Sequence, residues 1–257
     1  MSFPEQIRAL LLVGGNIKRI PADEPAVPSK GYVDIGGLPM AARTLQALRH
    51  AKRIGDITLV TPVENPDLSG VWSGVSAVAP ARDSLYTSLY SGLDKIEANS
   101  EPTILVAGDL PFITPEALDD FIERCAQHDD ASLWYGFVSK ENSQSKYPQL
   151  PHTWAKLDGK LYCGGGLTVM RPSVKETVRP GFEAMTSGRK SVLKLVKALG
   201  FGTLLSYCLG KLTIRQAAAA MERLMNTTCC PVESPYAETA FNVDDYENLL
   251  LARSLCQ

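Results

Sequence analysis

Apolar and polar positions follow two different periods along the first half of the chain. Short runs of consecutive apolar residues, typical of buried strands, occupy residues 9–13, 56–62 and 102–109. Longer stretches repeat apolar residues every three or four positions, which predicts helices over residues 40–54, 84–98 and 114–128. Strands and helices therefore alternate. This order predicts an α/β fold, in which an open, mostly parallel, Rossmann-like sheet carries helices on both faces and forms three layers.

The stretch over residues 114–128 carries clear signs of a helix start. Thr114 is a residue type that caps helix N-termini, Pro115 occupies the first helical position, and acidic residues lie in the first turn. In open α/β sheets, ligands bind outside the carboxyl ends of the strands. The sequences VGGNIKR and AGDLPF both follow predicted strands. We therefore expect both to face one cleft.

The second half of the chain is less regular. Apolar-rich segments predict strands over residues 130–140 and 163–172, separated by a polar stretch that we interpret as a loop. Residues 241–255 predict a turn that leads into a closing helix. We find no internal repeat and no low-complexity tract. A single domain over residues 1–257 is therefore expected.

Residues 191–226 are predicted to be largely helical, with interruptions at Gly200 and Gly202. We interpret residues 185–226 as a helical insertion within the domain rather than a separate unit. Its apolar piece FGTLLSYCLG suits a helix packed on the core better than a contact with a membrane or a partner.

Composition narrows the class of protein. The 257 residues carry 26 basic and 28 acidic side chains, a net charge of −2, which disfavours a nucleic-acid-binding protein. No apolar run approaches the ~18 residues of a membrane span, and the N-terminus lacks the pattern of a signal peptide. The six cysteines form no C-x-x-C pair, which disfavours zinc sites and disulfides. We expect a cytoplasmic protein with reduced thiols.

The first candidate site follows the first predicted strand. Gly14 and Gly15 permit a sharp turn that exposes backbone N–H groups to an anion, and Lys18 and Arg19 add positive charge. Lys30 opens the segment KGYVDIGGLPM, in which another glycine pair and a proline precede a helix. A phosphate-binding loop is one interpretation of these residues. A tight turn with solvated basic side chains is the other.

A second candidate site is built around Asp109, which follows a near-continuous apolar strand. A carboxylate there is costly to bury unless it is paired or bound to a metal. Mg²⁺ prefers one or two carboxylates together with phosphate oxygens and water. The segment FNVDDYENL offers Asn242, Asp244 and Asp245 before the last predicted helix. These residues either complete a metal site with Asp109 or cap the turns that follow them.

A run of three glycines lies in the sequence CGGGLTV, ahead of the predicted strand that it leads into. One explanation is the close approach of a ligand to the backbone, and the other is a β-bulge. The sequence favours neither explanation over the other.

Four motifs in order resemble the NTP transferases of the glycosyltransferase-A type fold, especially the molybdenum-cofactor guanylyltransferase-like group. That group opens with L-x-G-G-x-G-x-R and continues with a lysine ahead of a G-G-x-P turn. It carries G-D-x-P in the middle and N-x-D-x-x-E-x-L before the final helix. This chain has LVGGNIKR, KGYVDIGGLPM, GDLP and NVDDYENL in the same order across nearly its whole length.

The resemblance implies roles for individual residues. Arg19, Lys30 and Asp109 would be catalytic, with the two basic side chains holding the triphosphate and the leaving pyrophosphate. Asp109 and Asp244 would bind Mg²⁺, with Asn242 as a less certain ligand. The residues implied to contact nucleotide or acceptor are Gly14, Gly15, Ser84, Ser88, Gly164 and Gly165.

The function implied is that of a Mg²⁺-dependent nucleotidyltransferase. It would transfer an NMP from an NTP to a small phosphate-bearing acceptor and release pyrophosphate. The insertion at 185–226 would shape the acceptor site or form a homodimer contact. One departure stands out, because Ile17 replaces the third glycine of the family's loop, and a β-branched residue does not readily take a positive φ. Ile17 leaves open a catalytically impaired nucleotide-binding protein, and a glycosyltransferase that uses a nucleotide-sugar donor is the further alternative.

Overall fold

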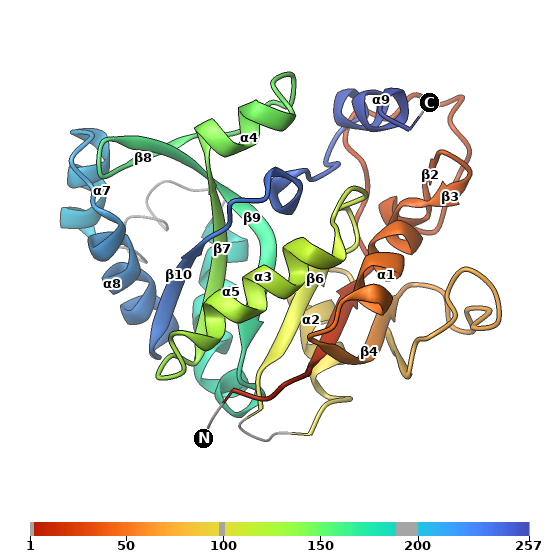
Figure 1. Cartoon of the computed structure of the whole chain (residues 1–257), viewed down its shortest axis with the longest axis horizontal. Helices are drawn as coiled ribbons and strands as arrows, with labels where there is room; N and C mark the ends of the chain where they lie inside the picture. The colour runs from red at the N-terminus through yellow and green to blue at the C-terminus, as the bar shows by residue number, and fades with distance from the viewer. Residues whose placement is uncertain (1–2, 98–100, 189–199, 257) are drawn as a thin grey trace.

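The computed structural model of the chain describes residues 3–97, 101–188 and 200–256. Its principal strands are β1 (Ile7–Leu12), β4 (Ile54–Thr61), β5 (Ala77–Pro80), β6 (Thr103–Ala107), β7 (Leu133–Ser139), β9 (Lys160–Met170) and β10 (Cys229–Glu233). They form one sheet in the order β10-β7-β9-β6-β1-β4-β5, and the short strand β8 (Ala155–Leu157) pairs with β9 (Figure 1). The predicted strands are thereby confirmed, and β5 and β10 are additional strands that the sequence did not reveal.

Parallel pairing dominates the sheet. β1 pairs in parallel with β4 and with β6, β4 pairs in parallel with β5, and β10 pairs in parallel with β7. β9 runs antiparallel to both β6 and β7. Because β1, β4, β5 and β6 share one direction, their carboxyl ends meet at one edge of the sheet. This edge is where the candidate motifs lie.

Helices cover both faces of the sheet, as predicted (Figure 1). Four helices share core clusters with residues of the sheet, namely α1 (Met40–His50), α2 (Leu85–Leu93), α3 (Pro115–Ala126) and α5 (Lys175–Gly188). Alternate side chains of β1 point to opposite faces. Ala9 and Leu11 pack in one core cluster with residues of α1 and α3, whereas Leu10 packs in another with residues of α2 and α5. The three-layer fold is confirmed.

The helix predicted over residues 40–54 is shorter than expected. It ends at His50, and Ala51 has an extended backbone. The backbone N–H groups of Lys52 and Arg53 donate to the carboxylate of Asp119, at 3.1 and 2.8 Å, instead of to helical carbonyls. The chain then enters β4. A long-range side-chain contact therefore ends this helix.

The helix predicted over residues 84–98 also ends early, at Leu93. Lys95 and Ile96 donate to carbonyls only three residues back, at 3.0 and 3.1 Å, so the last turn tightens and unwinds. The start is as predicted, because Ser84 is the N-cap and forms a capping box with Thr87.

Two predictions in the second half are wrong. The polar stretch taken as a loop contains the helix α4 (Lys140–Lys146), whose N-cap is Ser139, and the strand β8. The three glycines at 164–166 do not precede a strand, since β9 already begins at Lys160. Pairing with neighbouring strands, rather than local sequence, extends β9 across the glycines.

The predicted helical segment over residues 191–226 is described only from residue 200 onward. It contains α7 (Phe201–Cys208) and α8 (Ile214–Met225). Gly200 precedes α7 with a φ of 88°, but Gly202 lies inside α7, so no interruption occurs there. Helix α7 packs against α8, and its Leu205 is exposed. The expectation that this apolar piece packs on the core is therefore wrong. No helix in the described part of the chain is long and apolar enough to cross a membrane.

The last helix closes the fold near the N-terminal half. The remaining small elements are the 3-10 turns η1 (Lys30–Tyr32), η2 (Pro172–Val174) and η3 (Ala237–Ala240), the ribbon of β2 (Asp34–Ile35) and β3 (Leu38–Pro39), and helix α9 (Tyr246–Ser254). Figure 1 shows α9 next to β2, and the two elements are in contact. The chain between η3 and α9 thereby runs past the carboxyl ends of β1 and β6.

Candidate active site

The loop after β1, residues 14–19, is called the glycine loop, and it turns at Gly15 and Arg19. Gly15 has a φ of 79° and Arg19 a φ of 58°, while Ile17 does not have a positive φ. Ile17 instead points inward, is 7% exposed, and packs in a core cluster with Phe241 and Val243. The substitution of a glycine by Ile17 therefore causes no backbone strain, because the loop takes its left-handed residues elsewhere.

Lys30 is fixed against this loop by backbone and side-chain contacts. The buried Ser29 hydroxyl donates to the carbonyl of Val13 at 2.9 Å, and the Lys30 N–H donates to the carbonyl of Gly15 at 2.8 Å. Gly31 allows this approach, since a Cβ there would lie 2.5 Å from a methyl carbon of Val13. The start of η1 is therefore packed directly on the end of β1.

Asp109 reaches the same edge at the end of β6. The N–H of Gly108 donates to the carbonyl of Leu12 at 2.9 Å, and a Cβ on Gly108 would meet that same oxygen at 2.9 Å. Glycine is thus the residue that lets the two strand ends lie this close. Asp109 is buried. The motif G-D-x-P therefore places a buried carboxylate beside the glycine loop.

The segment before α9 runs between the glycine loop and Asp109. The N–H of Val243 donates to the carbonyl of Asp109 at 3.0 Å. On the other side, the Lys18 N–H donates to the carbonyl of Asp244 at 3.0 Å, and the Tyr246 N–H donates to the carbonyl of Lys18 at 3.1 Å. These three backbone hydrogen bonds join residues more than half the chain apart. They carry the side chains of residues 242–245 into the site.

Lys30, Asp109 and Asp244 form one charged cluster. The Lys30 ammonium contacts Oδ2 of Asp109 and donates to Oδ1 of Asp244 at 2.8 Å. Asn242 donates through Nδ2 to the other oxygen of Asp109 at 3.1 Å. Burial alone would lower the pKa of Lys30, but the two carboxylates outweigh it, and the net pKa is raised. The side chains of Asp109 and Asp244 thus both contact one ammonium group, that of Lys30.

Arg19 lies beside this cluster but pairs with other acids. Its guanidinium is 2.5 Å from Oδ2 of Asp245 and 3.8 Å from Glu247, and its side chain is 66% exposed. The second oxygen of Asp245 accepts from the N–H of Asn248 and caps α9. Sequence reasoning named Asp245 only as part of an acidic group. Its role as the partner of Arg19 had no local signature, because the two residues are 226 positions apart.

The two predicted serine contacts have structural roles. Ser84 caps α2, as described above. Ser88 is buried, and its hydroxyl accepts from the N–H of Arg82 at 2.8 Å and donates to the carbonyl of Arg82 at 3.2 Å. Both hydroxyls thus shape the turn after β5. A hollow of about 400 Å³ opens beside this turn, between α2 and α5, and Arg82 and Arg179 are among its lining residues.

The glycines of β9 answer the question left open by the sequence. The pairing of β7 with β9 shifts register between Tyr135 and Phe137, opposite the glycines, so the ladder is irregular there, as the β-bulge explanation expects. A Cβ on Gly166 would lie 2.8 Å from Leu110, and one on Gly165 would lie 3.4 Å from the backbone of Gly136. A Cβ on Gly164 would meet nothing within 4 Å. The close approach at the second and third glycines is therefore made by the protein itself.

The donor set of the cluster suits a divalent cation such as Mg²⁺. Oxygens of Asp109 and Asp244 converge on one cationic atom, the Lys30 ammonium. Across the described residues, no group of three or more His, Cys, Asp or Glu side chains could hold a metal ion. The protein would therefore supply two carboxylates, and phosphate oxygens and water would complete the shell, as Mg²⁺ commonly requires.

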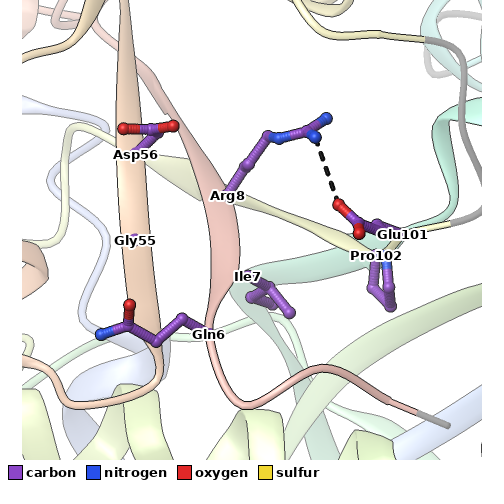
Figure 2. Close-up of a pocket in the computed structure, with 7 residues that line it drawn as sticks. All are labelled: Gln6, Ile7, Arg8, Gly55, Asp56, Glu101 and Pro102. Carbon is purple, nitrogen blue, oxygen red and sulfur yellow. Dashed lines mark hydrogen bonds and ion pairs between the residues drawn. The ribbon is translucent and has the colours of Figure 1, made fainter.

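A separate cavity of about 220 Å³ lies at the other end of the sheet. Figure 2 shows it between the amino ends of β1 and β4 and the residues leading into β6, with Arg8 turned toward Glu101, 3.2 Å away. Gln6 and Asp56 also line it. It opens away from the glycine loop and Asp109, so it takes no part in the site described above.

Comparison with known proteins identifies the relatives of this chain. The family described as the MobA-like NTP transferase domain matches residues 9–160. The chain is 26% identical over 235 residues to the chloroplastic 2-C-methyl-D-erythritol 4-phosphate cytidylyltransferase of Oryza sativa subsp. japonica. The matched region covers 86% of this chain and 74% of that protein. It is 27% identical over 133 residues to the enzyme of the same name from Clostridium botulinum, spanning 49% of this chain and 57% of that protein.

Solved structures confirm the fold. A structure described as a hypothetical transferase from Thermus thermophilus superposes with a TM-score of 0.82 at 26% identity, covering 95% of this chain and 99% of that one. A CMP:2-keto-3-deoxy-manno-octonic acid synthetase complexed with CTP superposes with a TM-score of 0.61 at 15% identity, covering 98% of each chain. These likenesses extend over the second half of the chain, beyond the residues that the family matches.

Proposed function

Because the chain belongs to the family of MobA-like NTP transferase domains, we propose that it transfers an NMP from an NTP to a small phosphate-bearing acceptor, with Mg²⁺ required and pyrophosphate released. One observation carries this proposal. Lys30, Asp109 and Asp244 meet at the carboxyl edge of the sheet, directly beside the glycine loop. Phosphoryl transfer requires of a protein mainly positive charge beside the phosphates and carboxylates that can hold a metal ion.

Each part has a separate task in this mechanism. Gly14 and Gly15 allow the triphosphate to approach the backbone. The ammonium of Lys30 neutralises charge on the phosphates, and the exposed guanidinium of Arg19 stabilises the pyrophosphate that leaves. Asp109 and Asp244 would hold Mg²⁺, which would supply positive charge to the reacting phosphates. The acceptor phosphate itself is the nucleophile, so the chain needs none of its own.

We propose CTP as the donor and a phosphorylated sugar or polyol as the acceptor. The relatives from rice and Clostridium botulinum, which are named cytidylyltransferases of a methylerythritol phosphate, support this choice. The resemblance of the motifs to the molybdenum-cofactor guanylyltransferase-like group supports GTP with a pterin acceptor instead. A pyrophosphate-release assay with each of the four NTPs, with and without Mg²⁺, across sugar, polyol and pterin phosphates distinguishes the two.

The residue test uses Asp109→Asn, which keeps the size of the side chain and removes its charge. We expect turnover to fall by about 10²–10³-fold, the loss typical for a group that stabilises transition-state charge. Asp94→Asn is the matched control, because Asp94 also pairs with a lysine, Lys175, at 2.9 Å, but lies at the C-terminal end of α2, outside the cluster. Turnover by Asp109→Asn equal to that of the control, in a folded protein, would exclude Asp109 from the site.

A further inference from the structure

The Lys30 ammonium lies where the carboxylates of Asp109 and Asp244 converge. It contacts Oδ2 of Asp109 and Oδ1 of Asp244, the latter at 2.8 Å. The three residues come from three separate segments, η1, the turn after β6 and the turn before α9. The side chains of Lys30 and Asp109 are only 16% and 7% exposed, so solvent screens their charges weakly.

The Lys30 ammonium already pairs with the carboxylate oxygens of Asp109 and Asp244 that a divalent metal would need as ligands. Two carboxylates facing one another without a cation repel, and the burial of Asp109 strengthens this repulsion, although the side chain of Asp244 is 59% exposed. A divalent ion that entered beside the ammonium would meet a like charge within a few ångströms of its position. Entry of the metal therefore requires Lys30 to move away from these two carboxylates.

The side chain of Lys30 lies close enough to the glycine loop to reach a ligand bound there. The stem of the side chain passes the glycine loop, since a Cβ on Gly15 would lie 3.7 Å from Cε of Lys30. Lysine has a flexible four-carbon stem and a compact ammonium group. Rotation about this stem carries the ammonium toward the loop. There, a triphosphate lying on the N–H groups of Gly14 and Gly15 would attract it more strongly than the two carboxylates do.

We propose that Lys30 occupies the cation position of the metal site while nucleotide is absent, so that metal and NTP enter together. This inference rests on the proposed function, because it takes Asp109 and Asp244 as the metal ligands. By linkage, the NTP raises the affinity for the metal by the same factor by which the metal raises the affinity for the NTP. The protein without nucleotide binds divalent cations weakly at this site.

The test measures Mn²⁺ binding without nucleotide, by the electron paramagnetic resonance signal of the free ion. Mn²⁺ serves as a visible substitute for Mg²⁺. Lys30→Met should bind Mn²⁺ at least about tenfold more tightly than the wild type, because one charge within contact distance of two carboxylates is removed. Lys30→Gln tests the same charge with a polar side chain if the methionine variant does not fold.

Two controls make the result specific. Lys175→Met also removes a lysine from a carboxylate, that of Asp94, and should leave Mn²⁺ binding unchanged. Adding Asp109→Asn to Lys30→Met should abolish the gain. Lys30 variants that bind Mn²⁺ no more tightly than the wild type would overturn the inference, as would a gain that survives the loss of Asp109.

The outcome is independent of turnover, so the two proposals can fail separately. Mg²⁺-dependent NTP turnover without a gain of Mn²⁺ binding by the Lys30 variants would contradict only the inference about Lys30. A gain of Mn²⁺ binding in a protein that turns over none of the four NTPs would support the position of Lys30 and contradict the proposed reaction.

Discussion

Replacing Ile17 by glycine tests whether this residue weakens the site or builds it. The family pattern has glycine here, so Ile17→Gly restores that pattern. In the structure, however, Ile17 is 7% exposed and packs with Phe241, Val243 and Leu249 beneath the segment that carries Asp244. Its side chain therefore joins the glycine loop to the C-terminal segment. We expect the variant to be less stable and to bind nucleotide less well.

The expected magnitude comes from two separate costs. Removing a buried isoleucine side chain down to Cβ costs about 2–5 kcal/mol, depending on how far the surroundings collapse. Glycine adds about 0.5–1 kcal/mol through the greater freedom of the unfolded backbone. The free energy of unfolding should therefore fall by about 2.5–6 kcal/mol, a large part of the stability of a typical domain. The KM for the NTP should rise, because the loop loses the contact that holds it.

Urea denaturation and steady-state kinetics check the two effects separately. Ile20→Gly is the matched control, since Ile20 belongs to the same loop region but is 39% exposed. The control should lose no more than about 1 kcal/mol. If Ile17→Gly were as stable as Ile20→Gly and bound the NTP more tightly than the wild type, the reasoning would be refuted. Ile17 would then weaken phosphate binding by the loop rather than stabilise the fold through packing.

Asp245→Asn keeps an N-cap for α9, so the melting temperature should be nearly unchanged. The substitution removes the charge beside Arg19, so the KM for the NTP should rise up to about fivefold. An unchanged KM would contradict this prediction. Burial lowers the pKa of His152 from its usual 6.5, so the unfolded chain binds that proton more readily and stability is lost as the pH falls below 6.5. Between about pH 7.5 and 5.5, the melting temperature of His152→Gln should therefore fall less than that of the wild type. Equal falls would refute the lowered pKa of His152. Iodoacetamide should modify the exposed Cys208 before Cys163, because burial raises the pKa of the Cys163 thiol to about 11. Peptide mapping by mass spectrometry measures the order of modification, and the reverse order would contradict the packing of β9.

Strands buried on both faces could be predicted within a few residues. The core strands β1, β4 and β6 need continuous apolar residues because helices cover them on two sides, and this need is visible in the sequence. Their parallel order then places every following turn at one edge. The meeting of Gly14 with Asp109 follows from this geometry, whereas long-range backbone hydrogen bonds bring in the segment before α9.

Elements stabilised by distant partners could not be predicted in the same way. Strand β5 is only four residues long and exists through its pairing with β4. Helix α1 ends where Asp119, far along the chain, accepts the next backbone N–H groups. The glycines of β9 belong to a strand because β6 and β7 pair with it on either side.

The sequence by itself determined the α/β order and the chemical types of side chain gathered at one edge of the sheet, because periodicity and strand direction are local properties. Only the tertiary structure decided how these side chains pair. Lys30 is 79 residues from Asp109 and 214 from Asp244, so no local pattern could show that one ammonium group joins both carboxylates. The role of Ile17 was decided in the same way. Its effect on the loop depends on whether a buried surface from the far end of the chain covers it, and that surface exists only in the folded protein.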